Sequence, residues 1–207
     1  LMLGEHGVAY GLAGRREASS ELAMHLLIYS RRPDIHAVCH AHPPIATAHA
    51  ASGIPLNKAL LSELVIALGC IPVAQYGTPG TPELSESLEP LVQNFDAILM
   101  ANHGVVTCGA DLLTAFYRME TVEHFAQVSL FSEMLGKQVL LSGRDVEKLL
   151  TARARYGTVT AATITPGCPV TSDSEASAAG APERISVTRE ELEALIEEAV
   201  RKDRAQR

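Results

Sequence analysis

The chain has 207 residues, of which 47% are hydrophobic and 20% are charged, as in ordinary globular domains. Its formal net charge is −7. This acidic balance, without any cluster of Lys and Arg, argues against a nucleic-acid-binding surface, because phosphate backbones are held by clustered positive charge. No apolar run approaches the roughly 20 residues that a membrane-spanning helix needs. Neither a nucleic acid nor a membrane is therefore an expected partner.

The four cysteines, Cys39, Cys70, Cys108 and Cys168, lie far apart and form no Cys-x-x-Cys pair. This spacing predicts buried thiols in a reducing compartment, and therefore a cytoplasmic location. The first residues, Leu-Met-Leu-Gly-Glu, carry no signal for a helix start or a loop and resemble the interior of a domain. We therefore expect that the N-terminal part of the domain is missing from this sequence.

Helices and strands are predicted to interleave along most of the chain, which is typical of an α/β domain. The pattern leaves open whether the strands are parallel. Helix caps, prolines, glycines and apolar periodicity mark the boundaries. In chain order, we expect a strand or hairpin at 7–12, a helix from 19–21 to 31, a strand at 35–40, a helix at 43–52, a helical stretch at 59–68, a strand at 71–74, a turn at 77–80, a helix at 82–93, strands at 97–101 and 105–108, and helices at 112–135 and 144–156.

The composition changes after the main body, which we assign to 1–164. Residues 165–182 are rich in Pro, Gly, Ser, Thr and Ala, as in flexible linkers. In residues 183–207, Thr188 and Glu191 form a capping box ahead of an apolar stripe at helical spacing. The stripe consists of Leu192, Leu195, Ile196, Ala199 and Val200. An isolated helix of this length is marginal in water, so we expect it to dock on another surface.

The run from Val38 to Pro43 carries the strongest chemical signal, because it contains a His-x-His pair. Alternate residues of a strand share one face, so His40 and His42 can approach the same ion. His103 follows an apolar strand and stands in a loop, where it could supply a third ligand. Alone, the pair fits a metal site and a polar surface equally well. A catalytic zinc site would keep one position open for water or substrate.

The other histidines have simpler explanations. His36 lies on the same strand face as His40, but about 13 Å away along the strand, which is too far to share an ion. His124 follows Glu120 by four positions on a helix, so an ordinary side-chain pair accounts for it. No metal-ligand spacing applies to His6, His25 and His49.

Two serines and a glutamate, Ser19-Ser20-Glu21, open the first long helix. Free backbone N–H groups make a helix N-terminus attractive to phosphate, and the hydroxyls of Ser19 and Ser20 would add donors. Serine also caps helices routinely, and this simpler role stays open for both residues.

Several motifs together resemble the class II aldolase/adducin family. They are Ser19-Ser20-Glu21, Leu27-Ile28-Tyr29, Arg32-Pro33-Asp34, His40-Ala41-His42-Pro43, the run from Ala74 to Gly80, and Ala101-Asn102-His103-Gly104. Their order and spacing look most like the L-fuculose-phosphate aldolase branch of the family, over roughly residues 1–160.

The resemblance implies a three-layer α/β/α fold with a central, largely antiparallel sheet. It also implies one zinc ion per subunit, held by His40, His42 and His103. Members of the family are typically homotetramers with active sites between subunits, so a homotetramer is the expected assembly. The implied substrate is a small-molecule sugar phosphate.

The resemblance also assigns roles in catalysis. Glu21 matches the family's acidic residue, which contacts the metal or acts as acid and base. Ser19 and Ser20 match the serines that hold the substrate phosphate, and Tyr156 resembles a tyrosine that helps to protonate the departing aldehyde. The expected activity is zinc-dependent retro-aldol cleavage of a ketose 1-phosphate of the fuculose or rhamnulose type, which yields dihydroxyacetone phosphate and an aldehyde.

Other members of the family offer alternatives. Sugar-phosphate epimerases and a dehydratase keep the metal histidines but change the acid and base groups, and adducin-like binding modules have lost the histidines. The short interval between His42 and His103 favours an aldolase over an epimerase, and the presence of all three histidines disfavours a binding module. Two family features are absent: phosphate-binding elements upstream of Glu21, and a tyrosine in the region 59–63.

The helix at 183–207, which follows a linker, resembles the C-terminal encapsulation peptides of bacterial microcompartment cargo. This resemblance implies a shell protein as a partner and a location inside a microcompartment. The alternative is that the helix docks on its own tetramer. Acidic residues flank the apolar stripe and argue against binding to an anionic membrane surface.

Overall fold

The computed structural model describes residues 2–3, 9–10 and 19–153, in which helices alternate with short strands. The helices are α1 (Leu22–Arg31), α2 (Pro44–Ala51), α3 (Ser62–Ala67), α4 (Pro82–Val92), α5 (Leu112–Met134) and α6 (Gly143–Arg153). The strands are β1 (Met2–Leu3), β2 (Ala9–Tyr10), β3 (Ala37–Ala41), β4 (Val73–Ala74), β5 (Ala97–Met100) and β6 (Gly104–Gly109). The first two strands pair with each other in a small antiparallel sheet of their own.

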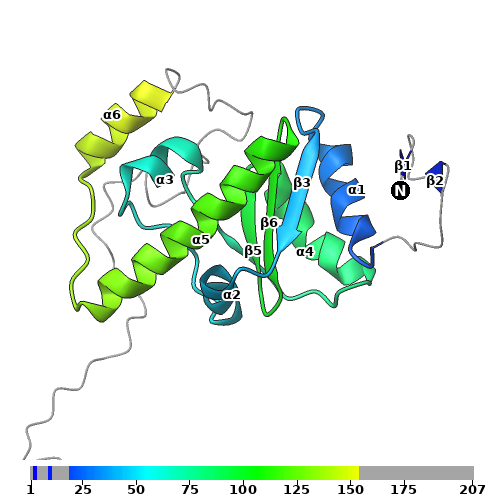
Figure 1. Cartoon of the computed structure of the whole chain (residues 1–207), viewed down its shortest axis with the longest axis horizontal. Helices are drawn as coiled ribbons and strands as arrows, with labels where there is room; N and C mark the ends of the chain where they lie inside the picture. The colour runs from blue at the N-terminus through cyan, green and yellow to red at the C-terminus, as the bar shows by residue number, and fades with distance from the viewer. Residues whose placement is uncertain (1, 4–8, 11–18, 154–207) are drawn as a thin grey trace, which may run out of the picture. The chain divides into compact units, whose positions relative to one another are not determined.

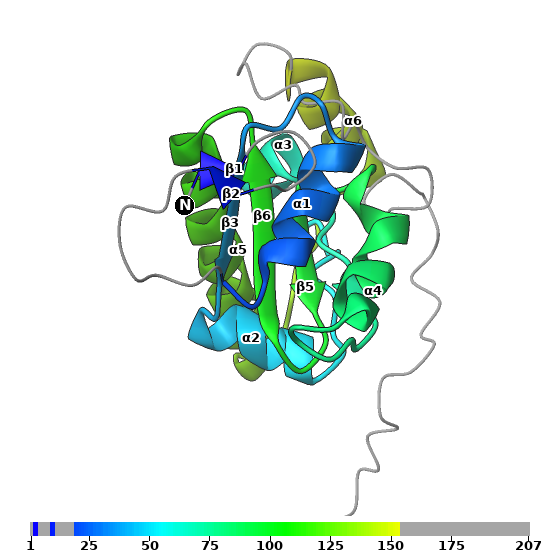
Figure 2. The ribbon, with the colours of Figure 1, turned by 90° about the vertical axis from the view of Figure 1, so that its right-hand side faces the viewer.

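Within the described residues, the central sheet has four strands in the order β3-β6-β5-β4. Strand β6 pairs antiparallel with β3 on one side and with β5 on the other, whereas β4 runs parallel to β5. Helices α1 and α4 cover one face of this sheet and α2 and α5 cover the other (Figures 1 and 2). The expected three-layer α/β/α fold with a largely antiparallel sheet is confirmed.

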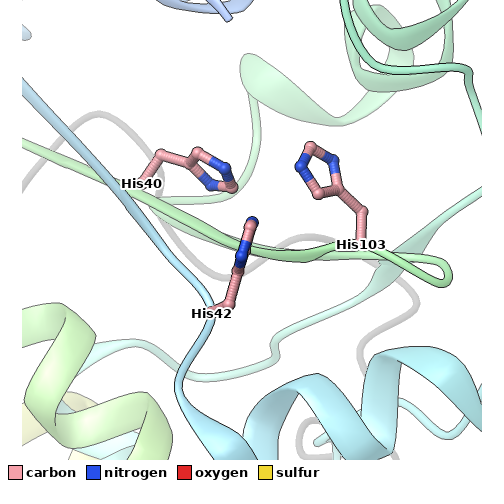
Figure 3. Close-up of side chains that lie close together, drawn as sticks. All are labelled: His40, His42 and His103. Carbon is pink, nitrogen blue, oxygen red and sulfur yellow. The ribbon is translucent and has the colours of Figure 1, made fainter.

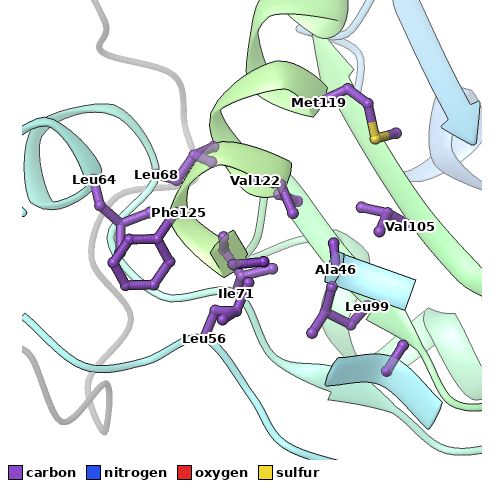
Figure 4. Close-up of a cluster of buried hydrophobic side chains, with 13 residues drawn as sticks. Ala46, Leu56, Leu64, Leu68, Ile71, Leu99, Val105, Met119, Val122 and Phe125 are labelled. Carbon is purple, nitrogen blue, oxygen red and sulfur yellow. The ribbon is translucent and has the colours of Figure 1, made fainter. Parts of the chain in front are cut away.

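The strands of the sheet contribute side chains to two apolar cores, one on each face. Leu99 and Val105 pack with residues of α2, α3 and α5, among them Phe125 (Figure 4). Their neighbours Ile98 and Val106 point to the other face and pack against α1 and α4. Every residue of β5 is buried, as in a strand that is covered on both faces. The continuous apolar run at 97–100 therefore requires a helical layer on each side.

Helix α3 is shorter than the helical stretch expected at 59–68, since it begins only at Ser62. The carbonyl of Ala59 accepts a hydrogen bond from the backbone N–H of Leu141, at 2.8 Å, instead of closing a helical turn. A contact between segments so far apart in sequence does not appear in local periodicity.

The strand expected at 71–74 joins the sheet only through Val73–Ala74. The backbone of Ile71 forms two hydrogen bonds with Leu56, each of 3.0 Å, in an isolated bridge. Ile71 and Leu56 are both almost fully buried in the core under α5. The apolar character of Ile71 therefore reflects its burial in this core, although Ile71 is not part of the sheet.

The C-terminal elements are only partly described. Helix α6 is described through Arg153, whereas the sequence predicts a helix that continues to 156. The linker at 165–182 and the helix at 183–207 lie outside the described residues. In the part of the chain that the structure describes, no helix combines the length and the apolar character needed to cross a membrane.

The cysteines follow the sequence prediction in part. Cys39 and Cys108 carry free thiols, and burial raises the pKa of Cys108 to about 12, with a further contribution from the negative charge of Asp96. Cys70 is disulfide-bonded. The expectation of a free thiol is therefore wrong for Cys70, because spacing along the chain does not reveal which cysteines meet in the fold.

Asp96, directly before β5, is the centre of a buried ion-pair network. Its two carboxylate oxygens accept hydrogen bonds from Arg32 and Arg118, both at 2.9 Å. Arg32 is the residue after α1 and Arg118 lies on α5, so the network joins both helical layers to the sheet. Arg32 also donates two hydrogen bonds to Asp34, which together with Asp96 raise the pKa of its guanidinium above the ordinary value against the opposing effect of burial.

Replacing Asp96 by alanine should lower the free energy of unfolding by about 3–5 kcal/mol, because one charge of a buried pair is then removed. Denaturant-induced unfolding, followed by circular dichroism, measures the change. The control Asp145→Ala removes a carboxylate that pairs with Lys148 on the surface and should have a much smaller effect. Equally small losses for both variants would contradict a structural role for Asp96.

Candidate metal centre

Three histidines from two distant segments meet at one end of the central sheet. His40 belongs to β3, His42 stands just after it, and His103 lies in the turn between β5 and β6. The ring centroids are 4.9 Å apart for His40–His42 and for His40–His103, and 5.1 Å apart for His42–His103. When one nitrogen is taken from each ring as the ligand atom, the three nitrogens all lie within 4.8 Å of one another. The rings point toward a common region of space (Figure 3).

Strand pairing explains why these residues meet. Ala41, the last residue of β3, is paired with Val105, the second residue of β6. His42 therefore leaves the sheet beside the turn that carries His103. Alternation along β3 keeps His40 and His42 on the same face, as the sequence predicts.

The turn that carries His103 depends on the conformation of Asn102. The backbone N–H of His103 donates a hydrogen bond to the carbonyl of Met100, at 3.0 Å, which closes a four-residue turn. Asn102 has a φ of 55°, in the left-handed region that asparagine tolerates better than most residues. The Asn-His-Gly sequence thus provides the turn as well as the candidate ligand.

Gly104 leaves room for the ring of His42. A Cβ at Gly104 would lie 2.4 Å from Cδ2 of His42 and 2.7 Å from the carbonyl oxygen of Ala41, distances that real Cβ atoms essentially never show. The absent side chain of Gly104 therefore allows the end of β3 and the start of β6 to approach closely.

A hydrogen bond fixes the orientation of the His40 ring. Its Nδ1 lies 2.9 Å from the carbonyl oxygen of Val105, which can only accept, so Nδ1 carries the proton and donates it. Nε2 is then unprotonated and available as a ligand. Burial lowers the pKa values of both His40 and His103. For each ring, burial has a larger effect than any nearby charge. Lower pKa values keep both rings neutral near pH 7, which is the form that binds a metal ion.

Two buried polar atoms near the histidines lack a hydrogen-bond partner among the described residues. They are Nδ1 of His103 and Oε2 of Glu21, whose side chain is only 9% exposed. The negative charge of Glu21 raises the pKa of His40 and of His103, although burial outweighs this effect. The carboxylate of Glu21 is therefore close enough to His40 and His103 to affect their protonation. Buried polar atoms without a partner are costly, and a bound cation would satisfy them.

The two serines before α1 lie beside Glu21 and do not cap the helix with their side chains in the usual way. Ser20 donates its hydroxyl to Oε1 of Glu21 at 3.3 Å, and the backbone N–H of Glu21 donates to Oγ of Ser19 at 3.2 Å. Both serines are exposed, and Gly80 lies close to Ser20, since a Cβ at Gly80 would be 4.0 Å from the Cβ of Ser20. Their hydroxyls are thus accessible at the edge of the site.

A cavity of about 590 Å³ opens between β4 and α4, close to the turn that carries His103. Ala74, which lines it, accepts a hydrogen bond from the backbone N–H of Ala101. Two carboxylates, Glu83 and Glu86, also line the cavity. Their negative charges disfavour an anion in this space.

The remaining candidates are placed as follows. His36 is exposed and does not belong to the histidine cluster, as the sequence predicts. His49 is buried in α2, and its Nδ1 has no hydrogen-bond partner among the described residues. His25 lies one helical turn after Glu21, and burial lowers its pKa. Tyr156 lies outside the described residues.

The residues of the cluster fit a divalent transition metal. Three imidazoles with a carboxylate nearby form a donor set that suits zinc and its neighbours, and three protein ligands leave a position open for a substrate. Sequence patterns predicted the three histidines that the structure brings together, but they missed the close contact at Gly104. The Asn-His-Gly sequence was the available signal, because glycine next to a ligand often marks a close backbone approach.

The fold is that of the class II aldolases. A solved structure described as L-fuculose 1-phosphate aldolase has a TM-score of 0.63 and 34% sequence identity, over 70% of this chain and 66% of that one. Residues 3–130 match the family described as the class II aldolase and adducin N-terminal domain, and the chain belongs to this family.

Two curated relatives carry different activities in their names. The chain is 32% identical to a 5-deoxy-D-ribulose 1-phosphate aldolase of Bacillus thuringiensis, over 70% of this chain and 68% of the relative. It is 33% identical to a 3-oxo-tetronate 4-phosphate decarboxylase of Haemophilus influenzae, over 67% of each chain. The chain spans about two thirds of the length of the relatives it matches.

The variant Gly104→Ala should weaken zinc binding about 10–100-fold, the range found when residues that orient metal ligands are altered, because the new methyl group displaces the ring of His42. Isothermal titration calorimetry with zinc measures the dissociation constant. As a control, Asn102→Gly alters the same turn but suits its positive φ, and it should bind zinc nearly as well as the wild type. Unchanged affinity for Gly104→Ala in a folded protein would rule out this positioning of His42.

Proposed function

We propose that this protein is a zinc-dependent aldolase that cleaves a ketose 1-phosphate of the fuculose or rhamnulose type into dihydroxyacetone phosphate and an aldehyde. The convergence of His40, His42 and His103 on one region is the observation that carries the proposal. When bound there, zinc supplies Lewis-acid stabilisation of the negative charge that develops on the substrate oxygens as the C3–C4 bond breaks. The names of the aldolase relatives support the same chemistry.

Glu21 is the proposed proton carrier. The carbon that loses its bond must receive a proton, and in the reverse direction it must release one. Oε2 of Glu21 is buried and has no partner among the described residues, so it is available for this transfer. The hydroxyl of Ser20 donates to the other oxygen, Oε1, and thereby holds the carboxylate in place. Tyr156 is proposed to act at the aldehyde end of the substrate, on the family resemblance alone.

Ser19 and Ser20 are the proposed phosphate ligands. Both are exposed, both precede the N-terminus of α1, and the positive end of the helix dipole favours an anion there. No Schiff-base lysine is needed, because a zinc ion would withdraw electrons from the substrate carbonyl in its place.

Rival reactions on this scaffold share the metal site. A decarboxylase is supported by the relative that carries that name, at 33% identity, and an epimerase or a dehydratase would use the same histidines with other acid and base groups. An adducin-like binding module would not need the three histidines. The released product separates these reactions, since only the aldolase yields dihydroxyacetone phosphate from a ketose 1-phosphate.

The variant Glu21→Gln should lower kcat by roughly 10²–10⁴-fold while zinc stays bound, because the proton carrier is lost and the three histidines remain. Release of dihydroxyacetone phosphate from fuculose 1-phosphate and rhamnulose 1-phosphate, coupled to NADH oxidation, measures turnover by the zinc-loaded protein. Zinc content is determined in parallel by metal analysis.

The matched control is Glu147→Gln, which alters an exposed carboxylate on α6 that lines no part of the cavity and should leave kcat unchanged. An unaltered kcat in Glu21→Gln would remove this residue from the mechanism. Absence of dihydroxyacetone phosphate with every ketose 1-phosphate, in a protein that binds zinc, would overturn the aldolase proposal and favour the decarboxylase or the epimerase.

We also propose that the protein is a homotetramer and that residues 183–207 bind a microcompartment shell protein. The first proposal rests on the family resemblance. The second rests on the sequence of the C-terminal segment, in which a capping box precedes an apolar stripe that a groove on a partner would cover. Confinement would retain a reactive aldehyde product inside the shell.

Deletion of residues 188–207 should leave aldolase activity and the tetramer intact and abolish co-purification with shell proteins. Size-exclusion chromatography with light scattering reports the assembly, and pull-down with a shell protein reports the interaction. Loss of catalysis or of the tetramer would instead show that the helix belongs to the enzyme's own fold.

A further inference from the structure

Helix α2 begins immediately after the ligand His42, and its N-terminus is unusual. Pro43 and Pro44 occupy the N-cap and the first helical position, and neither has a backbone N–H. The first backbone donors of α2 are therefore those of Ile45 and Ala46. No side chain of the N-cap residue bonds to them, because Pro43 has no acceptor.

A residue from another helix satisfies these donors. Glu123, on α5, accepts hydrogen bonds from the backbone N–H of Ile45 through Oε1, at 3.1 Å, and from that of Ala46 through Oε2, at 2.8 Å. The amide of Gln127, one turn later on α5, donates to Oε1 at 3.3 Å and orients the carboxylate. A negative charge at this position also opposes the positive end of the α2 dipole. Glu123 on α5 thus caps the N-terminus of α2 with both of its carboxylate oxygens.

This cap fixes the segment that contains His42 from one side. From the other side, the segment is fixed by the sheet, because Ala41 is paired with Val105. Between these anchors, proline at 43 confines its own φ to −65° and disfavours a helical backbone at His42. The backbone of His42 is therefore held between a strand end and a helix start that Glu123 secures.

We propose that Glu123 is a positioning residue for the metal site: it clamps the N-terminus of α2 and thereby holds His42 in register with His40 and His103. The proposal rests on the proposed metal site. Glu123 does not belong to the cluster of His40, His42 and His103, and it acts through the backbone that follows His42. Its effect on the site should consequently disappear when the imidazole of His42 is absent.

The test compares cobalt binding and stability in four metal-depleted variants, Glu123→Ala, Glu123→Gln, His42→Ala and the double variant, with the wild type. Titration with Co²⁺, followed by visible absorption and calorimetry, gives the dissociation constant and reports the ligand geometry. We expect Glu123→Ala to weaken binding about 10–100-fold, with an altered spectrum. Glu123→Gln keeps one acceptor oxygen and should lose less. Adding Glu123→Ala to His42→Ala should weaken binding by less than about threefold further, because the two residues act through the same ligand.

The matched control is Glu120→Ala, which removes an exposed carboxylate one turn earlier on α5 and should leave the affinity and the spectrum unchanged. Thermal unfolding of the metal-free variants separates positioning from bulk stability. If Glu123→Ala lowers the melting temperature but binds Co²⁺ like the wild type, the residue is merely structural and the proposal is overturned. Should Glu123→Ala not fold, wild-type affinity in Glu123→Gln at a lowered melting temperature would overturn it equally. A wild type that binds no Co²⁺ would refute the metal site itself.

Discussion

The antiparallel pairing of β3 with β6 is the constraint on which the candidate site depends. Residues 37–41 and 105–109 are aligned residue by residue, and this register brings His42 out of the sheet beside His103. A slip by one residue would turn His40 to the opposite face of the sheet. The register is secured by burial, since Val105 and Val106 lie in the two different apolar cores. Core packing on both faces thus fixes the geometry of polar groups at the strand end.

At the opposite end of the sheet from the histidines, the hairpin of β5 and β6 is stabilised by charge. Asp96 precedes β5, its carbonyl accepts a hydrogen bond from the backbone N–H of Cys108 on β6, and its carboxylate binds Arg32 and Arg118. Arg32 stands at the C-terminal end of α1, whose other end carries Glu21. The ion pair therefore ties down the helix that presents the proposed proton carrier. Helix α1 thus connects the buried ion pair of Asp96 at one of its ends with the carboxylate of Glu21 at the other.

Local sequence patterns were sufficient to predict the histidine cluster and most elements. The His-x-His pair on a strand, the capping region before α1 and the apolar runs of β5 and β6 are short-range signals, and the structure brings the three histidines together. The strand directions were not predictable from the pattern. The family resemblance predicted a largely antiparallel sheet, but not the parallel pair of β4 and β5.

Contacts between distant segments account for what the sequence did not reveal. The bonds from Ile45 and Ala46 to Glu123 and the bond from Leu141 to Ala59 join segments that no periodicity relates. The tight approach of Gly104 to His42 is likewise a tertiary contact. Glycine and glutamate are common residues, and their roles here depend on what the fold places against them.

The most direct measurement for the central claim is a crystal structure of the zinc-loaded protein with anomalous data collected at the zinc absorption edge. We expect an anomalous peak about 2.0–2.1 Å from one ring nitrogen each of His40, His42 and His103, with at least one coordination position left for water or substrate. Zinc bound elsewhere, or a His103 ring turned away from the other two in the loaded protein, would contradict the central claim.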